Sequence, residues 1–372
     1  MKRFLWFTAV LFLAAGCNPR GQTPALNEAA PAPADIYAPP RHYVCCRSSG
    51  PITIDGRLDE AAWSAAPWTE DFIDIEGTRQ PAPRFRTRAK MLWDDRYLYI
   101  AAQLEEPHVW ATLTEHDSVI FHDNDFELFI DPDGDNHNYA EFEINALNTG
   151  WDLLLKKPYR DGGPADNSWE IPGLKTAVYV DGTLNNGADE DHGWSVEIAL
   201  PWEVLGKLSD QPAPPRDGDQ WRVNFSRVEW RTDVVDGKYV KVPGLREDNW
   251  VWSPQGVIDM HRPETWGYVQ FSTAAPGAAP YQPDPAGPAK HLLHRIYYAE
   301  QAFYKRHQRY ANSLQELGLA GLSDETLAGP PVIEGETDRF QATAEVLYPE
   351  GGRRWRIRED SRIWPLSEPG KR

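Results

Sequence analysis

The chain contains few cysteines, and this excludes one common way of stabilising an exported protein. Among 372 residues there are three cysteines, Cys17, Cys45 and Cys46. Adjacent cysteines can close only a strained ring, so Cys45 and Cys46 do not make a disulfide framework. We expect them to be small buried thiols at the entry to the first strand, in preference to a redox or metal-binding pair.

A membrane-spanning hydrophobic run is also missing near the start. The apolar run Phe4–Ala15 follows Lys2 and Arg3, and it is shorter than the about 18 residues that a spanning helix needs. It therefore predicts a secretory signal peptide.

The segment LAAGC at Leu13–Cys17 resembles a bacterial lipobox. This resemblance implies cleavage before Cys17 and attachment of lipid to its sulfur, so that residues 1–17 are a lipoprotein signal with the lipidated cysteine. Asn18 does not resemble the inner-membrane retention signal, which favours the outer membrane or cell surface of a bacterial envelope. Residues 18–40 are rich in Pro, Ala and Asn and predict a flexible tether.

Basic charge is scarce, and the deficit is confined to one part of the chain. The net charge is -18; residues 41–285 carry 22 Lys and Arg against 42 Asp and Glu, whereas residues 286–372 carry 13 and 12. A nucleic-acid partner would need a basic face, so none is expected. The sequence also lacks a phosphate-binding glycine loop, a metalloprotease helix motif, a nucleophile elbow and an internal repeat. We therefore expect a protein that is not an enzyme.

Short alternating runs separated by Gly, Pro and Asp dominate residues 41–273. Alternation of polar and apolar residues predicts strands with one buried face. The pattern predicts an all-β domain, an antiparallel immunoglobulin-like β-sandwich. The expected strands are 87–93, 97–104, 125–130, 139–147, 175–180, 194–200, 221–230 and 266–271.

The composition changes at a Pro, Ala and Gly linker, residues 274–289, and we expect a small α+β unit at 290–372. Helical spacing of apolar residues predicts a helix within His291–Leu317, with a second short helix starting at Ser313. Two strands are expected at 342–348 and 355–359. The segment weakly resembles a type IV pilin-like domain without the processing site, and it is either an independent domain or a helix and hairpin that pack on the sandwich.

Three motifs in order resemble the family 9 carbohydrate-binding modules, within a wider group of sandwich domains that bind sugars or haem. They are IDGRLDEAAW at Ile54–Trp63, MLWDDRYLYIAAQL at Met91–Leu104, and NDFELFIDPDGD, which starts at Asn124. The resemblance covers about Pro51 to Ser272. It implies a β-sandwich that binds carbohydrate.

The resemblance also implies where a sugar would bind. In that family an aromatic residue six positions before a glutamate forms one wall of the sugar-binding slot. The corresponding residues here are Phe121 as the wall and Glu127 as the hydrogen-bond acceptor. The position of an arginine in that family corresponds to Glu143 here, and the position of an asparagine corresponds to Asn145. A second aromatic wall falls near Met260.

Other residues of this region are candidates on chemical grounds, because sugars need flat aromatic faces and paired acceptors. Trp250 and Trp252 lie a little upstream of the second wall, and each of them, like Trp151, either contacts ligand or belongs to the core. For Glu127 the alternative is a rim carboxylate paired with Lys or Arg. For the face that carries Glu143 and Asn145 the alternative is exposure to solvent.

Calcium is the expected cofactor. Asp131, Asp133 and Asp135 place carboxylates at alternate positions of a turn, as hard-cation loops do, and the resembled family binds calcium. The loop lacks the complete EF-hand series, so a structural ion is expected. A transition-metal or acid–base cluster of nearby histidines and aspartates is less favoured than exposed loop residues; the set is His116, His122, His137, Asp117 and Asp123.

The sequence thus predicts a lipid-anchored envelope protein that binds an oligosaccharide or polysaccharide without catalysis. One alternative is a haem b-binding electron-transfer domain, for which Met91 and Met260 are available ligands. Another is a structural envelope lipoprotein whose sugar site has decayed. A glycosidase with two carboxylates is allowed by composition but has no motif.

Overall fold

The computed structural model describes residues 39–348 and 351–366. Cys17 and almost all of the predicted tether lie outside the described residues. Among the residues described, no helix is both long and apolar enough to cross a membrane.

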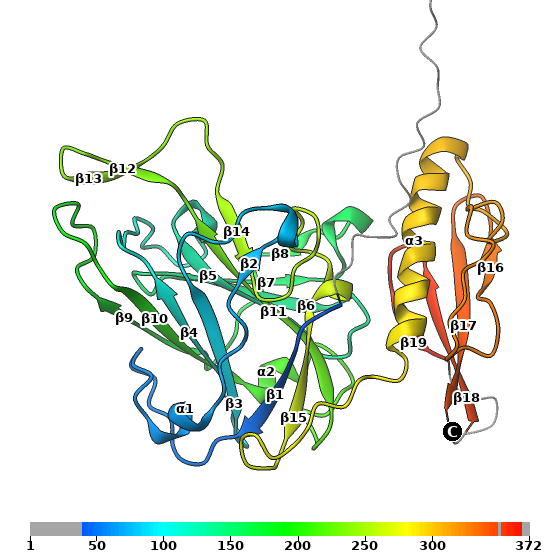
Figure 1. Cartoon of the computed structure of the whole chain (residues 1–372), viewed down its shortest axis with the longest axis horizontal. Helices are drawn as coiled ribbons and strands as arrows, with labels where there is room; N and C mark the ends of the chain where they lie inside the picture. The colour runs from blue at the N-terminus through cyan, green and yellow to red at the C-terminus, as the bar shows by residue number, and fades with distance from the viewer. Residues whose placement is uncertain (1–38, 349–350, 367–372) are drawn as a thin grey trace, which may run out of the picture. The chain divides into compact units, whose positions relative to one another are not determined.

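Most of the region predicted as a sandwich is one curled sheet of 13 strands, shown in Figure 1. The strand order is β8-β7-β6-β5-β11-β15-β1-β3-β4-β10-β9, with β14 joined to β11 and β2 joined to β14. The strands are β1 (His42–Arg47), β2 (Ile73–Asp74), β3 (Thr87–Trp93), β4 (Tyr97–Glu105), β5 (Asp125–Asp131), β6 (Tyr139–Asn145), β7 (Gly150–Leu155), β8 (Ala165–Asp166), β9 (Lys175–Asp181), β10 (Gly193–Pro201), β11 (Gln220–Glu229), β14 (Asp248–Val251) and β15 (Gly267–Ser272).

The all-β prediction is confirmed, with one local difference. Pairing is antiparallel except at β1, which runs parallel to both β15 and β3. These pairs place the first strand between the last strand of the domain and β3. Residues 48–86, which link β1 to β3, include the short strand β2, paired with β14. A separate hairpin follows β11 and consists of β12 (Thr232–Val235) and β13 (Lys238–Lys241).

The interior of the curled sheet is filled by the apolar positions of the alternating strands. Edge-to-face aromatic contacts bind β3, β11 and β15 to α2 (Trp202–Leu205), since Trp202 packs against Trp93, Trp221 and Phe271 with ring centroids 6.4, 5.7 and 5.9 Å away. Such pairs stabilise beyond the area that they bury. These tryptophans are therefore core residues and not a sugar-stacking surface.

The motif at Ile54–Trp63 is held by a buried carboxylate. Glu197 of β10 accepts from the backbone nitrogens of Asp55 and Gly56 at 2.9 and 2.8 Å and from Trp63 Nε1 at 2.7 Å. Gly56 has φ +86°, and a Cβ there would lie 2.5 Å from the backbone nitrogen of Tyr179. Only glycine fits this turn, which leads into α1 (Ala61–Ala65).

The C-terminal residues form a smaller core of their own. Helix α3 (Gly287–His307) is followed by the four-stranded sheet of β16 (Val332–Gly335), β17 (Phe340–Tyr348), β18 (Gly351–Arg358) and β19 (Ile363–Pro365). The predicted helix is present, and it ends at His307 because Gln308 adopts a left-handed conformation, φ 54°, that closes its end. The second helix predicted from Ser313 is wrong: residues 313–317 form turns.

Candidate functional site

The register of three neighbouring strands places two glutamates and a tryptophan in one row. Glu127 of β5 pairs with Glu143 of β6, which pairs with Trp151 of β7. The next row on the same face is Phe129, Glu141 and Leu153, because side chains two positions apart share a face of a strand. The alternation seen in the sequence thus creates an acidic and aromatic surface.

This surface is the floor of a cavity of about 250 Å³. Its remaining walls come from η2 (Ile120–His122), η3 (Tyr159–Asp161) and the segments around β14 and η4 (Pro263–Thr265). The lining residues are Phe121, Glu127, Phe129, Glu141, Glu143, Trp151, Leu153, Tyr159, Val228, Glu247, Asn249, Met260 and His261. Ligand cavities for drug-sized molecules span roughly 300 to 1,000 Å³, so this one suits a small unit such as a single sugar ring.

The first predicted wall is held in place by one of the glutamates. Glu143 Oε2 accepts a hydrogen bond from the backbone nitrogen of Phe121 at 3.0 Å. The Phe121 ring lies 6.4 Å from that of Trp151, at an interplanar angle of 31°. Trp230 Nε1 also donates to the carbonyl oxygen of Phe121 at 2.9 Å. The aromatic wall is therefore made by two side chains, one of which is anchored on both sides of its backbone.

Glu127, Glu141 and Glu143 are buried, and the described residues that line the cavity include no Lys or Arg. Burial raises the pKa of Glu127 to about 7, and the nearby charge of Glu247 contributes less to the same shift. Burial and the charges of neighbouring acids raise the pKa values of Asp125, Glu141 and Glu143 well above the usual range. Near neutral pH the group thus holds protons as well as negative charge, and so can both donate and accept hydrogen bonds.

Several polar atoms here have no hydrogen-bond partner among the described residues. Glu141 Oε2 and Trp151 Nε1 belong to the cavity lining, and Asp125 Oδ2 lies in the neighbouring row of β5. Buried polar groups are normally paired, because leaving one unpaired costs about 1 to 3 kcal/mol. The cavity therefore presents an unused acceptor and an unused donor beside its aromatic wall.

Three predicted site residues are not brought to the cavity. The Asn145 side chain donates to Leu113 O and Asp123 Oδ2 and accepts from the backbone nitrogens of Leu147 and Thr149. Its amide is thus fully used in shaping the turn after β6.

The two tryptophans lie in the hydrophobic core. Trp250 is 3% exposed and Trp252 is fully buried, with its Nε1 donating to Glu70 at 3.1 Å. The core alternative that the sequence left open describes both residues.

The cavity also contains residues that the set of predicted site residues omits. Trp151 follows Glu143 by strand pairing, and Tyr159, which is 48% exposed, lies with its ring 4.4 Å from that of His261. Burial lowers the pKa of His261 to about 4, so its imidazole is neutral near neutral pH. Trp151 lies in β7, whose sequence GWDLLL does not alternate and was not among the predicted strands, and its pairing partner was not fixed by local pattern.

The acidic loop keeps its three aspartates together. One carboxylate oxygen each of Asp131, Asp133 and Asp135 lies within 4.8 Å of the others. Asp131 accepts from the backbone nitrogens of Gly134 and Asn136 at 2.9 Å each, and Asp135 pairs with Arg362 at 2.9 Å. Burial and the neighbouring aspartate raise the pKa of Asp133 to about 6. The carboxylate set fits a hard cation, and Arg362 already supplies part of the positive charge.

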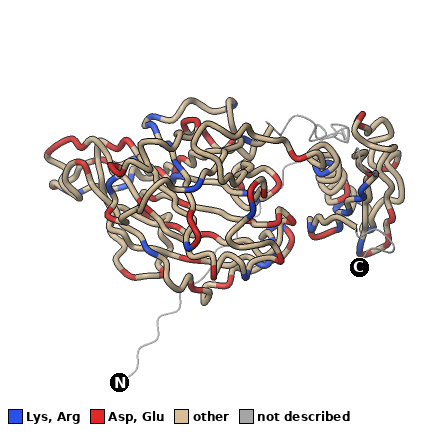
Figure 2. Tube along the Cα trace, turned by 90° about the horizontal axis from the view of Figure 1, so that it is seen from below, with Lys and Arg blue, Asp and Glu red and all other residues tan. Residues whose placement is uncertain are grey.

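A larger hollow of about 370 Å³ includes Arg222, Glu264 and Lys290. Each of these charged side chains already has a partner. Arg222 donates a hydrogen bond to the carbonyl oxygen of Trp266, Glu264 pairs with Arg160, and Lys290 pairs with Asp284. We therefore regard the acidic and aromatic cavity as the better site. Figure 2 shows Asp and Glu distributed along much of the trace, in keeping with the excess of acid in residues 41–285.

Comparison with known proteins shows which family part of the chain resembles. Residues 54–216 match the model of the carbohydrate family 9 binding domain-like family. The exoglucanase XynX of Acetivibrio thermocellus is 25% identical over 163 residues, which are 43% of this chain and 12% of that protein.

Two structures of a family 9 carbohydrate-binding module from Caldicellulosiruptor kristjanssonii are also similar. The complex with cellotriose has a TM-score of 0.42 at 16% identity and covers 65% of this chain and 100% of the module. The complex with glucose has a TM-score of 0.42 at 15% identity and covers 64% and 100%. By the family match, residues 54–216 of the chain belong to the carbohydrate family 9 binding domain-like family.

Proposed function

We propose that the acidic and aromatic cavity binds one ring of an oligosaccharide or polysaccharide, and that the protein does so without catalysis. The observation that carries this proposal is the row Glu127, Glu143 and Trp151 beside Phe121 in a cavity of about 250 Å³. The apolar face of a sugar ring packs on Phe121 and Trp151, while its hydroxyls pair with the carboxyl groups. The family to which residues 54–216 belong supports this assignment.

The protonation of the acids suits hydroxyl groups, each of which both donates and accepts. Carboxyl groups that share protons near neutral pH supply acceptor oxygens and O–H donors on the same wall. Glu141 Oε2 and Trp151 Nε1 add an unpaired acceptor and an unpaired donor. The position that is arginine in the resembled family is Glu143, so the ligand meets a carboxyl group where a guanidinium would stand.

The arrangement of the acids favours binding over hydrolysis. Glu127 and Glu143 are directly opposite each other on neighbouring strands and project from the same face of the sheet. A glycosidase places an acid and a second carboxylate on either side of the scissile bond. Here both carboxyl groups are on one side of the cavity.

The haem alternative has less support. Met91 is fully buried in the hydrophobic core of the sheet. Met260 lines the cavity beside His261, but a cavity of about 250 Å³ is small for a macrocycle, and the Nδ1 of His261 is 3.1 Å from the hydroxyl of Tyr139.

We further propose that Cys17 is lipidated and anchors the protein to a bacterial outer membrane or cell surface, and that calcium binds at Asp131, Asp133 and Asp135. The lipobox supports the first proposal. The proximity of the three carboxylates supports the second.

A glycan array probed with the full chain and with a Trp151→Ala variant tests the binding proposal. We expect a small set of oligosaccharides to bind the wild type and to lose binding to the variant. A matched control is Trp355→Ala, which removes a tryptophan of β18 in the C-terminal core. Equal binding by wild type and Trp151→Ala, or no binding by either, would overturn the assignment of this cavity.

A further inference from the structure

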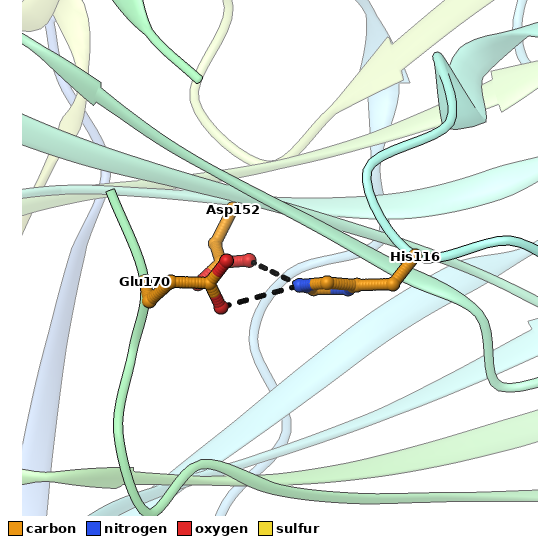
Figure 3. Close-up of side chains that lie close together, drawn as sticks. All are labelled: His116, Asp152 and Glu170. Atoms are coloured by element: carbon orange, nitrogen blue, oxygen red, sulfur yellow. Dashed lines mark hydrogen bonds and ion pairs between the residues drawn. The ribbon is translucent and has the colours of Figure 1, made fainter. Parts of the chain in front are cut away.

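A second polar group lies outside the sugar cavity and joins three segments that are distant in the sequence. His116 is in the loop between β4 and β5, Asp152 is in β7, and Glu170 is in the loop between β8 and β9. One ligand atom of each lies within 4.8 Å of the others. Figure 3 shows the imidazole pointing its nitrogen at both carboxylates. The histidine does not join His122 or His137, with which the sequence had associated it.

The hydrogen bond on the far side of the ring fixes which nitrogen is available. His116 Nδ1 lies 2.9 Å from the carbonyl oxygen of Gly150. A carbonyl oxygen only accepts, so Nδ1 carries the hydrogen, and in the neutral ring Nε2 presents a lone pair. A bond from the second ring nitrogen to a backbone carbonyl is the arrangement that orients metal-binding histidines.

That lone pair faces only acceptors among its charged neighbours. Nε2 of His116 lies 3.3 Å from oxygens of Asp117, Asp152 and Glu170 alike. Three carboxylates and a nitrogen lone pair repel one another unless a positive charge lies between them. That positive charge is supplied either by protonation of Nε2, which then donates to Glu170 at 3.3 Å, or by a bound cation that takes the place of the proton.

Asp152 provides a separate observation that points to a ligand. The residue is 1% exposed, and its Oδ2 accepts from the backbone nitrogen of Ile171 at 2.7 Å. Its other oxygen, Oδ1, has no hydrogen-bond partner among the described residues, and its contact with His116 Nε2 at 3.3 Å is an ion pair only when the imidazole is protonated. An unpaired oxygen on a buried carboxylate is costly. A metal bond would satisfy it.

We propose that His116, Asp152 and Glu170 bind a transition-metal ion, with zinc as the best match, and that Asp117 adds negative charge beside it. Bonds of about 2.0 to 2.1 Å from zinc place tetrahedral ligands about 3.3 to 3.4 Å apart, which agrees with the separations of 3.3 Å from Nε2 to Asp152 and Glu170. A ligand set that includes imidazole favours zinc over calcium, which takes oxygen ligands.

The ion would connect the loop that leads into Phe121 with β7. Gly150, whose carbonyl oxygen orients His116, directly precedes Trp151, and Asp152 directly follows it. A metal at this point would fix both aromatic walls of the cavity from outside. The metal site itself does not depend on what the cavity binds.

Metal binding by the full chain, purified without a polyhistidine tag and stripped with chelator, tests the proposal. Elemental analysis after dialysis and calorimetry would be run with zinc, manganese and calcium. We expect one zinc per chain and an affinity at least about tenfold lower in His116→Gln and in Asp152→Asn. His116 is 53% exposed, so its variant should fold even if the Asp152 variant does not.

His192→Gln is the matched control. His192 is an exposed histidine paired with Asp181 at 3.4 Å, outside the group, and its loss should leave zinc binding unchanged. Zinc bound equally by wild type and His116→Gln would be adventitious and would overturn the proposal. Failure to bind zinc at one equivalent, or loss of calcium binding in place of zinc binding in His116→Gln, would overturn it as well.

Discussion

Replacing Glu127 by glutamine should stabilise the fold at high pH while weakening any ligand bound in the cavity. Burial raises the pKa of Glu127 from 4.5 to about 7. Because the folded-state pKa is the higher one, the unfolded chain releases its proton first as the pH rises. The stability contributed by the protonated group is therefore full below pH 4.5 and is lost progressively until about pH 7.

The size of the effect follows from the shift. One pKa unit corresponds to 1.36 kcal/mol, so ionised Glu127 costs the folded state on the order of 3 kcal/mol above pH 7. Glutamine has nearly the same shape and no charge. We expect Glu127→Gln to raise the free energy of unfolding by about 1 to 3 kcal/mol at pH 8 and to change it little at pH 4.5.

Urea unfolding followed by circular dichroism at the two pH values measures this difference. Glu115→Gln, at an exposed glutamate of the same region, is the control and should have no effect at either pH. If Glu127→Gln destabilises the protein equally at both pH values, the carboxylate is an ionised and paired structural group. The reasoning from its burial would then be wrong.

Three further predictions concern other parts of the chain. Cys17→Ser should release the protein from the membrane fraction, and its retention there would show a different anchor. Added calcium should raise the melting temperature of chelator-treated wild type but not of Asp133→Asn if calcium binds the acidic loop; equal melting with and without added calcium would count against that ion. Arg227 is 1% exposed and pairs with Glu106 and Glu229 at 2.8 and 2.9 Å. Arg227→Met should therefore lower the free energy of unfolding by about 3 to 5 kcal/mol. Arg231→Met removes an exposed pair with Asp248 and should lower it by at most about 1 kcal/mol.

Local pattern was enough to place most strands. The alternating run at 87–93 forms β3 over the same residues, and the runs at 97–104 and 125–130 are each one residue short of β4 and β5. The period of two is visible in the sequence, although both faces of β5 and nearly all of β3 and β4 are buried in the structure. The helical spacing of apolar residues that begins at Leu292 ends at His307, which is also the last residue of α3.

The candidate site was only partly predictable. Phe121 and Glu127 were found from the spacing of six residues that the family resemblance implies, and the structure places both in one cavity. Asn145 has the expected spacing, but its amide is used by the turn that it begins. Trp151 enters the site through pairing with Glu143 across strands, and such a register is set by the whole sheet and not by local sequence.

The proposed role of the cavity in sugar binding is tested most directly by calorimetry at pH 8 with the best ligand from the array, comparing wild type with Phe121→Leu and Glu127→Gln. Loss of one stacking ring should weaken binding by about 0.5 to 1.5 kcal/mol. Loss of a charged acceptor that the ligand covers should weaken it by about 1.5 to 3 kcal/mol. We therefore expect both variants to fold and to bind the ligand less tightly than wild type, and Glu127→Gln to have the lower affinity. Unchanged affinity in both folded variants would contradict the account and place the ligand elsewhere.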